Sequence, residues 1–193
     1  TRQLDRARKT VEEVNKKIYD KLTDNKEMSE KEKNEISKIV GLAALKYADL
    51  SNQISKDYIF DIDKFTSIEG DTGPYILYTI VRIKSIIKKY KENNPNFVKS
   101  KITIPSSNVE RNIMLLISQF NQTIKQAYSE NAPYKICIYL YKLATEFNLF
   151  YNNTKILKEE KATAEAHIEL ITLVKHVLEI GIDLLGFSAP DKM

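Results

Sequence analysis

Tyr75, Tyr78 and Arg82 are spaced three and four residues apart, so in a helix they lie on one face, which Ser85 and Lys89 continue. Tyrosine rings stack on unpaired bases at roughly 1–3 kcal/mol per base, while arginine and lysine bind the phosphates. This combination suits a single-stranded RNA loop better than a duplex, because the bases of a loop are accessible. Tyrosines at helical spacing can equally be the half-buried edge of a hydrophobic core.

Positive charge is concentrated in the second part of the chain. The net charge of the 193 residues is +4, with −1 in residues 1–72 and +5 in residues 73–193. Between Arg82 and Lys101 there are seven basic residues and a single acid, Glu92. Such a concentration is typical of a protein that binds a polyanion. The alternative is a solvated helix end followed by a lysine-rich loop.

Other chemistry has little support in the sequence. The two histidines, His167 and His176, and the single Cys137 are not spaced as a metal-binding cluster, and neither GxxxxGK[ST] nor GxGxxG occurs. The segment KEMSEKEK superficially resembles a catalytic lysine loop, but Ser29 and Glu32 are explained better as the capping box of a helix. No enzyme active site is predicted.

One cysteine excludes an internal disulfide and favours a reducing, cytoplasmic setting. No apolar run approaches the roughly 20 residues that a membrane span needs. The chain opens with TRQLDRARK, charged and without an initiator methionine, so we expect a piece of a longer protein without a signal peptide.

Only five glycines and five prolines interrupt the chain, which favours an all-α helical bundle. On the first helix, Leu4, Ala7, Val11, Val14 and Ile18 share one face, which we expect to be buried. We expect KDYIFDIDKF to be extended and to end in a short helical turn. The predicted helices cover about residues 4–22, 29–50, 73–90, 107–129 with a kink near residue 120, 133–152, and 159–185 closed by Gly186.

The helix that carries the tyrosines has a clear start. Thr72 is its predicted N-cap, and Pro74 stands in the first turn, where its missing N–H does no harm. The glycines before it permit a tight loop. A separate stripe on the same helix has the spacing of a buried face and comprises Ile76, Ile80, Ile83, Ile87 and Tyr90.

Three segments resemble one family. VGLAALKYADLSNQISKDYIFDIDKFTSIEGDTGPYILYTIVRIKSI is similar to the part of arginyl-tRNA synthetases that joins the catalytic core to the anticodon-binding domain. YKICIYLYKLATEFNLFYNNTKIL and the ending LLGFSAPDKM resemble the helical C-terminal domain of the same family. The resemblance runs from about Glu30 to Met193.

The resemblance implies the C-terminal portion of a class I synthetase that attaches arginine to its tRNA. Residues 1–72 would be a helical connector, and residues 73–193 the α-helical anticodon-binding domain. ATP and magnesium would bind in the catalytic region upstream, so we expect no cofactor and no catalysis in this piece alone. The expected partners are arginine tRNA and the protein's own catalytic domain, with a monomeric state and no membrane.

The resemblance also implies roles for particular residues. The residues expected at the anticodon loop are Tyr78, Tyr151 and Met193, with Tyr75 and Arg82 on the same face. The loop expected to approach the inner side of the tRNA comprises Glu69, Gly70, Asp71, Thr72 and Gly73. The residues expected to contact phosphates are Lys84, Lys88, Lys89, Lys99 and Lys101.

Two positions depart from the family pattern. Leu77 stands where the family commonly has glutamine, and His167 where it commonly has arginine. The first departure affects polar contacts near the loop, and the second affects a contact within the domain. A different class of function also stays open at this point, namely a structural or protein-interaction helical module without an RNA partner.

Overall fold

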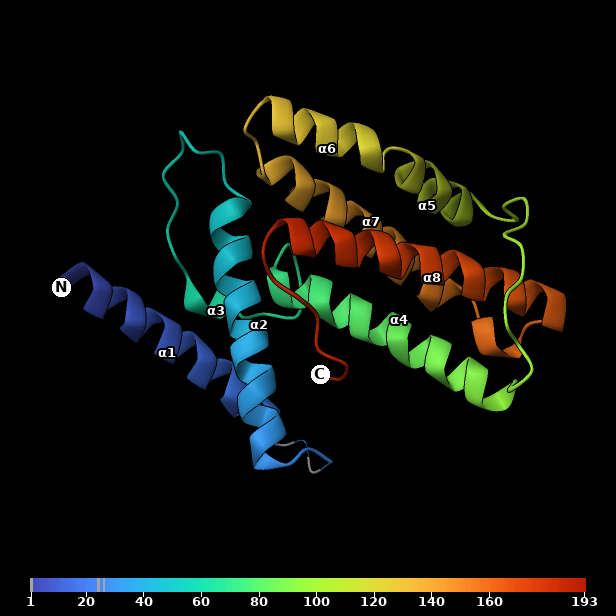
Figure 1. Cartoon of the computed structure of the whole chain (residues 1–193), viewed down its shortest axis with the longest axis horizontal. Helices are drawn as coiled ribbons and strands as arrows, with labels where there is room; N and C mark the ends of the chain where they lie inside the picture. The colour runs from blue at the N-terminus through green and yellow to red at the C-terminus, as the bar shows by residue number, and fades with distance from the viewer. Residues whose placement is uncertain (1, 24, 26) are drawn as a thin grey trace.

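The computed structural model describes residues 2–23, 25 and 27–193, with side chains from residue 4 onward. In this part of the chain all regular structure is helical and no strand is present, which confirms the predicted all-α fold. The elements are α1 (Arg2–Leu22), α2 (Glu30–Leu50), α3 (Ile62–Phe65), α4 (Gly73–Asn93), α5 (Asn108–Ser118), α6 (Phe120–Ser129), α7 (Tyr134–Asn153), the 3-10 helix η1 (Ile156–Lys158) and α8 (Lys161–Leu184) (Figure 1).

A bundle of α4, α7 and α8 forms the centre of the molecule, and α5 and α6 lie along α7 (Figure 1). The helix α2 joins this bundle by packing on α4, and α1 packs on α2. Buried side chains from α1, α2 and α4 through α8 form one hydrophobic core. The predicted domain division between residues 72 and 73 falls at the N-cap of α4, and it stays a prediction.

Three helix ends follow the predicted capping chemistry. Ser29 and Glu32 form a complete capping box at α2. The sequence also predicts a capping box of Ser107 with Glu110; Ser107 caps α5, but the Glu110 carboxylate accepts the N–H of Ser106, at 3.2 Å, instead of the N–H of the cap residue. Gly186, with φ of 81°, follows α8 in the left-handed conformation that a Schellman ending requires.

The predicted inner face of α1 is wrong over its first half. Leu4, Ala7 and Val11 are exposed, the first by 63%, whereas Val14 and Ile18 are buried. The physical reason is visible in Figure 1, where only the second half of α1 lies against α2. Periodicity finds the apolar stripe of a helix, but it does not say how much of that stripe a neighbouring helix covers.

Smaller differences concern helix boundaries. The helix α4 continues to Asn93, past the predicted end at Tyr90, and α8 begins at Lys161 after the separate turn of η1. The expected kink near residue 120 is confirmed as a break at Gln119, which separates α5 from α6. The buried stripe of α4 is confirmed except at Ile87, which is only partly buried.

The last residues run between α2 and α4 (Figure 1). Lys46 of α2 donates to the carbonyl of Gly186 at 2.8 Å, and Lys84 of α4 donates to the carbonyl of Pro190 at 3.2 Å. Lys192 forms an ion pair with Glu32 at 2.6 Å, and with the Ser29 backbone and hydroxyl it lowers the pKa of Glu32 to about 2. The chain end is therefore tied to both helices.

The first turn of α4 packs so closely on α2 that a side chain does not fit between the two backbones. The hydroxyl of Thr72 accepts the N–H of Tyr75 at 3.1 Å and donates to the carbonyl of Ser67 at 2.6 Å, which confirms the predicted N-cap. A Cβ added at Gly73 would overlap the carbonyl oxygen of Ala43 and lie 3.0 Å from the Tyr47 Cβ. Only glycine permits this approach.

We predict that Gly73→Ala lowers the free energy of unfolding by about 1–3 kcal/mol, because the added methyl group meets backbone that cannot move aside. Gly41→Ala is the matched control, since its Cβ would meet chiefly the end of the Asn15 side chain, which can rotate. Its cost should stay below about 1 kcal/mol, offset by the better helix propensity of alanine. Urea unfolding of both variants measures the difference, and equal stabilities would contradict the close approach as the reason for glycine.

Candidate nucleic-acid interface

The guanidinium of Arg82 lies against two tyrosine rings. Its Cζ is 4.6 Å from the ring centre of Tyr78 and 5.0 Å from the ring centre of Tyr151. The same group donates to the Tyr78 hydroxyl at 2.9 Å and to Asn148 Oδ1 at 2.6 Å. A cation over an aromatic ring contributes roughly 0.5–2 kcal/mol, depending on its solvation. Arg82 therefore connects the middle of α4 to the end of α7.

Asn148 of α7 is the centre of the hydrogen bonds around this arginine. Its Nδ2 donates to the Tyr75 hydroxyl at 3.0 Å and to Thr79 Oγ1 at 3.0 Å. Because a guanidinium has no acceptor, the Arg82 bond requires the amide oxygen to face the arginine, and this orients both amide hydrogens toward α4. We call Tyr75, Tyr78, Arg82, Asn148 and Tyr151 the tyrosine–arginine cluster.

The cluster lies at the surface. Tyr75, Tyr78 and Arg82 are partly buried, and 39% of Tyr151 is exposed. The Tyr151 ring also stacks on Phe147, with ring centres 6.3 Å apart. The exposed part of Tyr151 is thus accessible to a base, while the arginine covers part of both rings. The partial burial of this face of α4 fits both alternatives that the sequence left open, and its contact with RNA stays a prediction.

The predicted phosphate-binding lysines differ in what they contact. Lys84 pairs with Asp191 at 3.1 Å and with Glu179 at 3.8 Å, so acids of the protein already balance its charge. The exposed Lys88 pairs with Glu92 at 3.9 Å. Lys89, Lys99 and Lys101 are exposed and form no ion pair within the described part of the chain. Their phosphate contacts stay predictions.

The predicted tRNA-proximal loop has an internal anchor. The buried Tyr47 hydroxyl lies 2.6 Å from Asp71 Oδ1 and 3.0 Å from the carbonyl oxygen of Cys137. Burial and then the Asp71 carboxylate raise the pKa of Tyr47 far above its usual range, so the phenol stays a donor. The same two causes raise the pKa of the Cys137 thiol to about 12. Asp71 therefore holds the loop to Tyr47 of α2, whose hydroxyl also contacts the backbone of α7, and Glu69 and Gly70 remain exposed.

Within the described residues, the hydrogen bonds and ion pairs of the chain end are made with Lys46, Lys84 and Glu32, and none is made with the tyrosine–arginine cluster. Lys84, which binds the tail, is two residues from Arg82, and this spacing corresponds to about 200° around a helix. Met193 is partly buried against the hydrophobic core. Its contact with an anticodon loop stays a prediction.

The two departures from the family pattern lie inside the protein. Leu77 is fully buried in the core. His167 is buried with its Nε2 3.8 Å from Glu110 Oε2, and its ring meets Phe150 edge-on at 5.1 Å. Burial raises the pKa of Glu110, but hydrogen bonds from Ser106 and Ser107 outweigh this effect and lower it. Both departures therefore concern packing and leave the exposed cluster unchanged.

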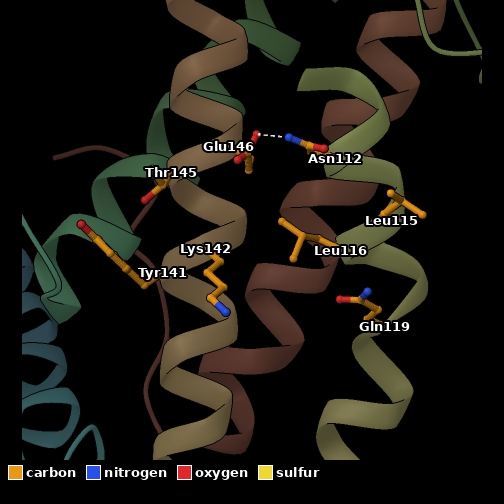
Figure 2. Close-up of a pocket in the computed structure, with 8 residues that line it drawn as sticks. All are labelled: Asn112, Leu115, Leu116, Gln119, Tyr141, Lys142, Thr145 and Glu146. Carbon is orange, nitrogen blue, oxygen red and sulfur yellow. Dashed lines mark hydrogen bonds between the residues drawn. The ribbon is translucent and has the colours of Figure 1, made fainter. Parts of the chain in front are cut away.

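Two hollows border this face. One, of about 450 Å³, lies between α5 and α7, and Figure 2 shows Leu115, Leu116 and Tyr141 around it, with Asn112 bonded to Glu146 at 3.4 Å. It adjoins the cluster through Tyr141, whose ring centre is 5.6 Å from that of Tyr75. The other hollow, of about 530 Å³, lies next to Tyr151.

The described residues contain neither a metal-binding cluster nor a membrane-spanning helix. Among those described, no three His, Cys, Asp or Glu side chains are grouped closely enough to hold a metal ion. Within the same ranges, no helix has both the length and the apolar character needed to cross a bilayer.

Comparison with known proteins identifies the family of this chain. The family model of the DALR anticodon binding domain matches residues 76–193, so the chain belongs to that family. The arginine–tRNA ligase of Agathobacter rectalis is 50% identical over 192 residues, which cover 95% of this chain and 32% of the relative. The arginine–tRNA ligase of Alkaliphilus oremlandii is 49% identical, with 97% and 32% covered.

Solved structures agree with the sequence relatives. The arginyl-tRNA synthetase of Thermus thermophilus matches with a TM-score of 0.87 and 26% identity, covering 96% of this chain and 32% of that chain. The enzyme of Plasmodium falciparum matches with a TM-score of 0.83 and 26% identity, covering 95% and 33%. The chain spans about a third of the length of these proteins.

This face also includes Asn148, Thr79 and Tyr141, which were not among the residues predicted from the sequence. Asn148 and Tyr151 are three residues apart and Tyr141 is one heptad before Asn148, so helical spacing on α7 could have grouped them. What spacing does not show is that this face of α7 lies against the tyrosine face of α4.

We predict that Asn148→Ala lowers the free energy of unfolding by about 1–3 kcal/mol, because three hydrogen bonds of about 0.5–1.5 kcal/mol each lose a partner. Asn121→Ala, an exposed asparagine of α6, is the control and should change stability by less than about 0.5 kcal/mol. Urea unfolding of the two variants gives the comparison. If Asn148→Ala is as stable as the control, the network does not hold α4 to α7.

Proposed function

We propose that this chain is the C-terminal, tRNA-binding portion of an arginine–tRNA ligase. In the longer protein, a separate catalytic region would attach arginine to tRNA using ATP and magnesium, while this chain binds the anticodon loop of the same tRNA. The observation that carries the proposal is the partly exposed tyrosine–arginine cluster within a domain of the anticodon-binding family. That the attached amino acid is arginine is proposed from the names of the relatives.

The geometry suggests how such a loop would be bound. An unpaired base contacts the exposed part of Tyr151, and phosphates on either side are neutralised by lysines without an acidic partner, such as Lys89. Asn148 and Arg82 hold the rings in place before RNA arrives, so little side-chain entropy is lost on binding. Tyr75 and Tyr78 then serve mainly to position this surface.

The rest of the longer protein is the second proposed partner. Leu4, Ala7 and Val11 form an apolar stripe that the described part of the chain leaves exposed. We propose that the catalytic region packs on this stripe and thereby fixes the distance between the two ends of the tRNA-binding surface. A monomeric state and a cytoplasmic location remain parts of this proposal.

Direct binding tests the function. The chain should bind a transcript of its cognate arginine tRNA, and the affinity should fall steeply as salt rises, because phosphate neutralisation releases counterions. ATP–pyrophosphate exchange by the chain alone should be undetectable. Absence of tRNA binding at low salt by the folded chain would overturn the proposal and favour a protein-interaction module.

Tyr151 provides the sharpest single-residue test. Tyr151→Ala should weaken tRNA binding by about 1–3 kcal/mol, whereas Tyr151→Phe, which keeps the ring, should cost less. Tyr128→Ala is the matched control, because Tyr128 lies on α6 and is 86% exposed. Fluorescence anisotropy with labelled tRNA measures all three variants. Equal affinities of Tyr151→Ala and Tyr128→Ala would remove Tyr151 from the binding surface.

A further inference from the structure

The hollow next to Tyr151 contains chemistry that the tyrosine–arginine cluster does not use. It has a volume of about 530 Å³ and lies between the second half of α4 and the segment that links α7 to η1. Ligand sites in proteins commonly have roughly 300–1,000 Å³. We call it the lysine pocket, and its polar lining comprises Ser85, Lys89, Asn152, Thr154, Lys155 and Lys158.

The charged residues that line the lysine pocket are all positive. Three lysines line it and no acid does, although Glu159 and Glu160 follow Lys158 in the sequence. Each helix C-terminus carries a partial charge of about −0.5, so the ends of α4 and α7 together offset about one lysine. An excess of about two positive charges remains, which exceeds the single negative charge of an RNA phosphodiester.

The remaining lining suits a nucleotide. Ile86 and Ile156 are 7% and 3% exposed and form an apolar floor of the pocket. Within the described chain, the side chains of Ser85 and Asn152 have no hydrogen-bond partner in the protein, so they are free to bond the edge of a base or a ribose. Tyr151 forms the wall shared with the cluster, where Arg82 approaches its ring to 5.0 Å.

We propose that the lysine pocket binds one unpaired nucleotide of the RNA loop, with Lys89, Lys155 and Lys158 holding its phosphate. The proposal rests on the proposed function, because it places this nucleotide next to the base that contacts Tyr151. It adds Lys155, Lys158, Asn152 and Ser85 to the binding surface, and it gives the loop a direction along α4, from the cluster toward the end of that helix.

The hollow in Figure 2 lacks these properties. The charge of its single lysine, Lys142, is balanced by that of Glu146, and the other residues that line it are uncharged. It therefore has no excess charge for a phosphate. This difference makes lysines on that side of the molecule suitable controls.

The experiment uses the full 193-residue chain and a 17-nucleotide anticodon stem–loop of its cognate arginine tRNA. Each loop linkage is replaced in turn by an uncharged methylphosphonate, and affinities are measured by anisotropy for the wild type and for Lys155→Gln/Lys158→Gln. In the wild type, neutralising the phosphate held in the pocket should weaken binding. In the double variant, where Lys89 is the remaining lysine of the pocket, the same replacement should have a much smaller effect, while replacements at other linkages keep theirs.

Salt dependence gives an independent readout. Losing one single-strand phosphate contact should reduce the slope of log K against log salt by about 0.7. A fourfold rise in salt should then weaken wild-type binding about threefold more than binding by the double variant. Lys125→Gln/Lys142→Gln, with the same loss of charge on exposed helix positions, should retain the wild-type slope. Lys155→Arg/Lys158→Arg should bind as the wild type does.

The outcomes separate this proposal from the proposed function. If the wild type binds the stem–loop and the Gln double variant keeps its salt slope and its methylphosphonate profile, the lysine pocket is not a phosphate site and the proposed function stands. A fall in melting temperature without a change in binding would assign the lysines to the helix ends alone. If the folded wild type does not bind the stem–loop at low salt, both proposals are overturned.

Discussion

The contact between the first turn of α4 and the backbone of α2 is the constraint on which the rest of the binding face depends. Gly73 has no side chain, so α4 begins against the carbonyl of Ala43, and Thr72 closes the first turn from the preceding loop. The hydroxyl of Tyr47 contacts Asp71 of that loop and the carbonyl of Cys137 in α7, and so connects the loop to α7. Because a helix is rigid over two turns, its start determines the direction in which Tyr75, Tyr78 and Arg82 point.

From that start, polar contacts between α4 and α7 build the surface. Hydrophobic packing brings the two helices together, but apolar contacts are not directional and tolerate sliding. Asn148 adds three directional hydrogen bonds, and the planar guanidinium of Arg82 lies against rings from both helices. These contacts define one rotation of α4 relative to α7. Under the proposed function, a face so ordered in advance loses little conformational entropy when RNA binds.

Charge is distributed by the fold as well as by composition. Lysines that lie near one another in the sequence have different surroundings, since Lys84 pairs with Glu179 and Asp191 while Lys89 faces an open hollow. Conversely, Lys89 and Lys155 are distant in sequence and line the same pocket. A count of basic residues between Arg82 and Lys101 therefore indicates the sign of the partner's charge, but not which lysines are available to it.

The sequence by itself determined the all-helical fold, the main helices, the buried stripe of α4 and the tyrosine–arginine face, because these follow from local signals: capping side chains, proline and glycine positions, and spacing along one helix. The family was predicted separately, from the resemblance of three segments to arginyl-tRNA synthetases. Only the tertiary structure decided that Asn148 joins Arg82 to two other side chains of α4 and that acidic residues pair with Lys84. It also decided that the apolar side chains in the first half of α1 are exposed. Each of these depends on which faces of two helices meet, and that is set by packing between residues far apart in the chain.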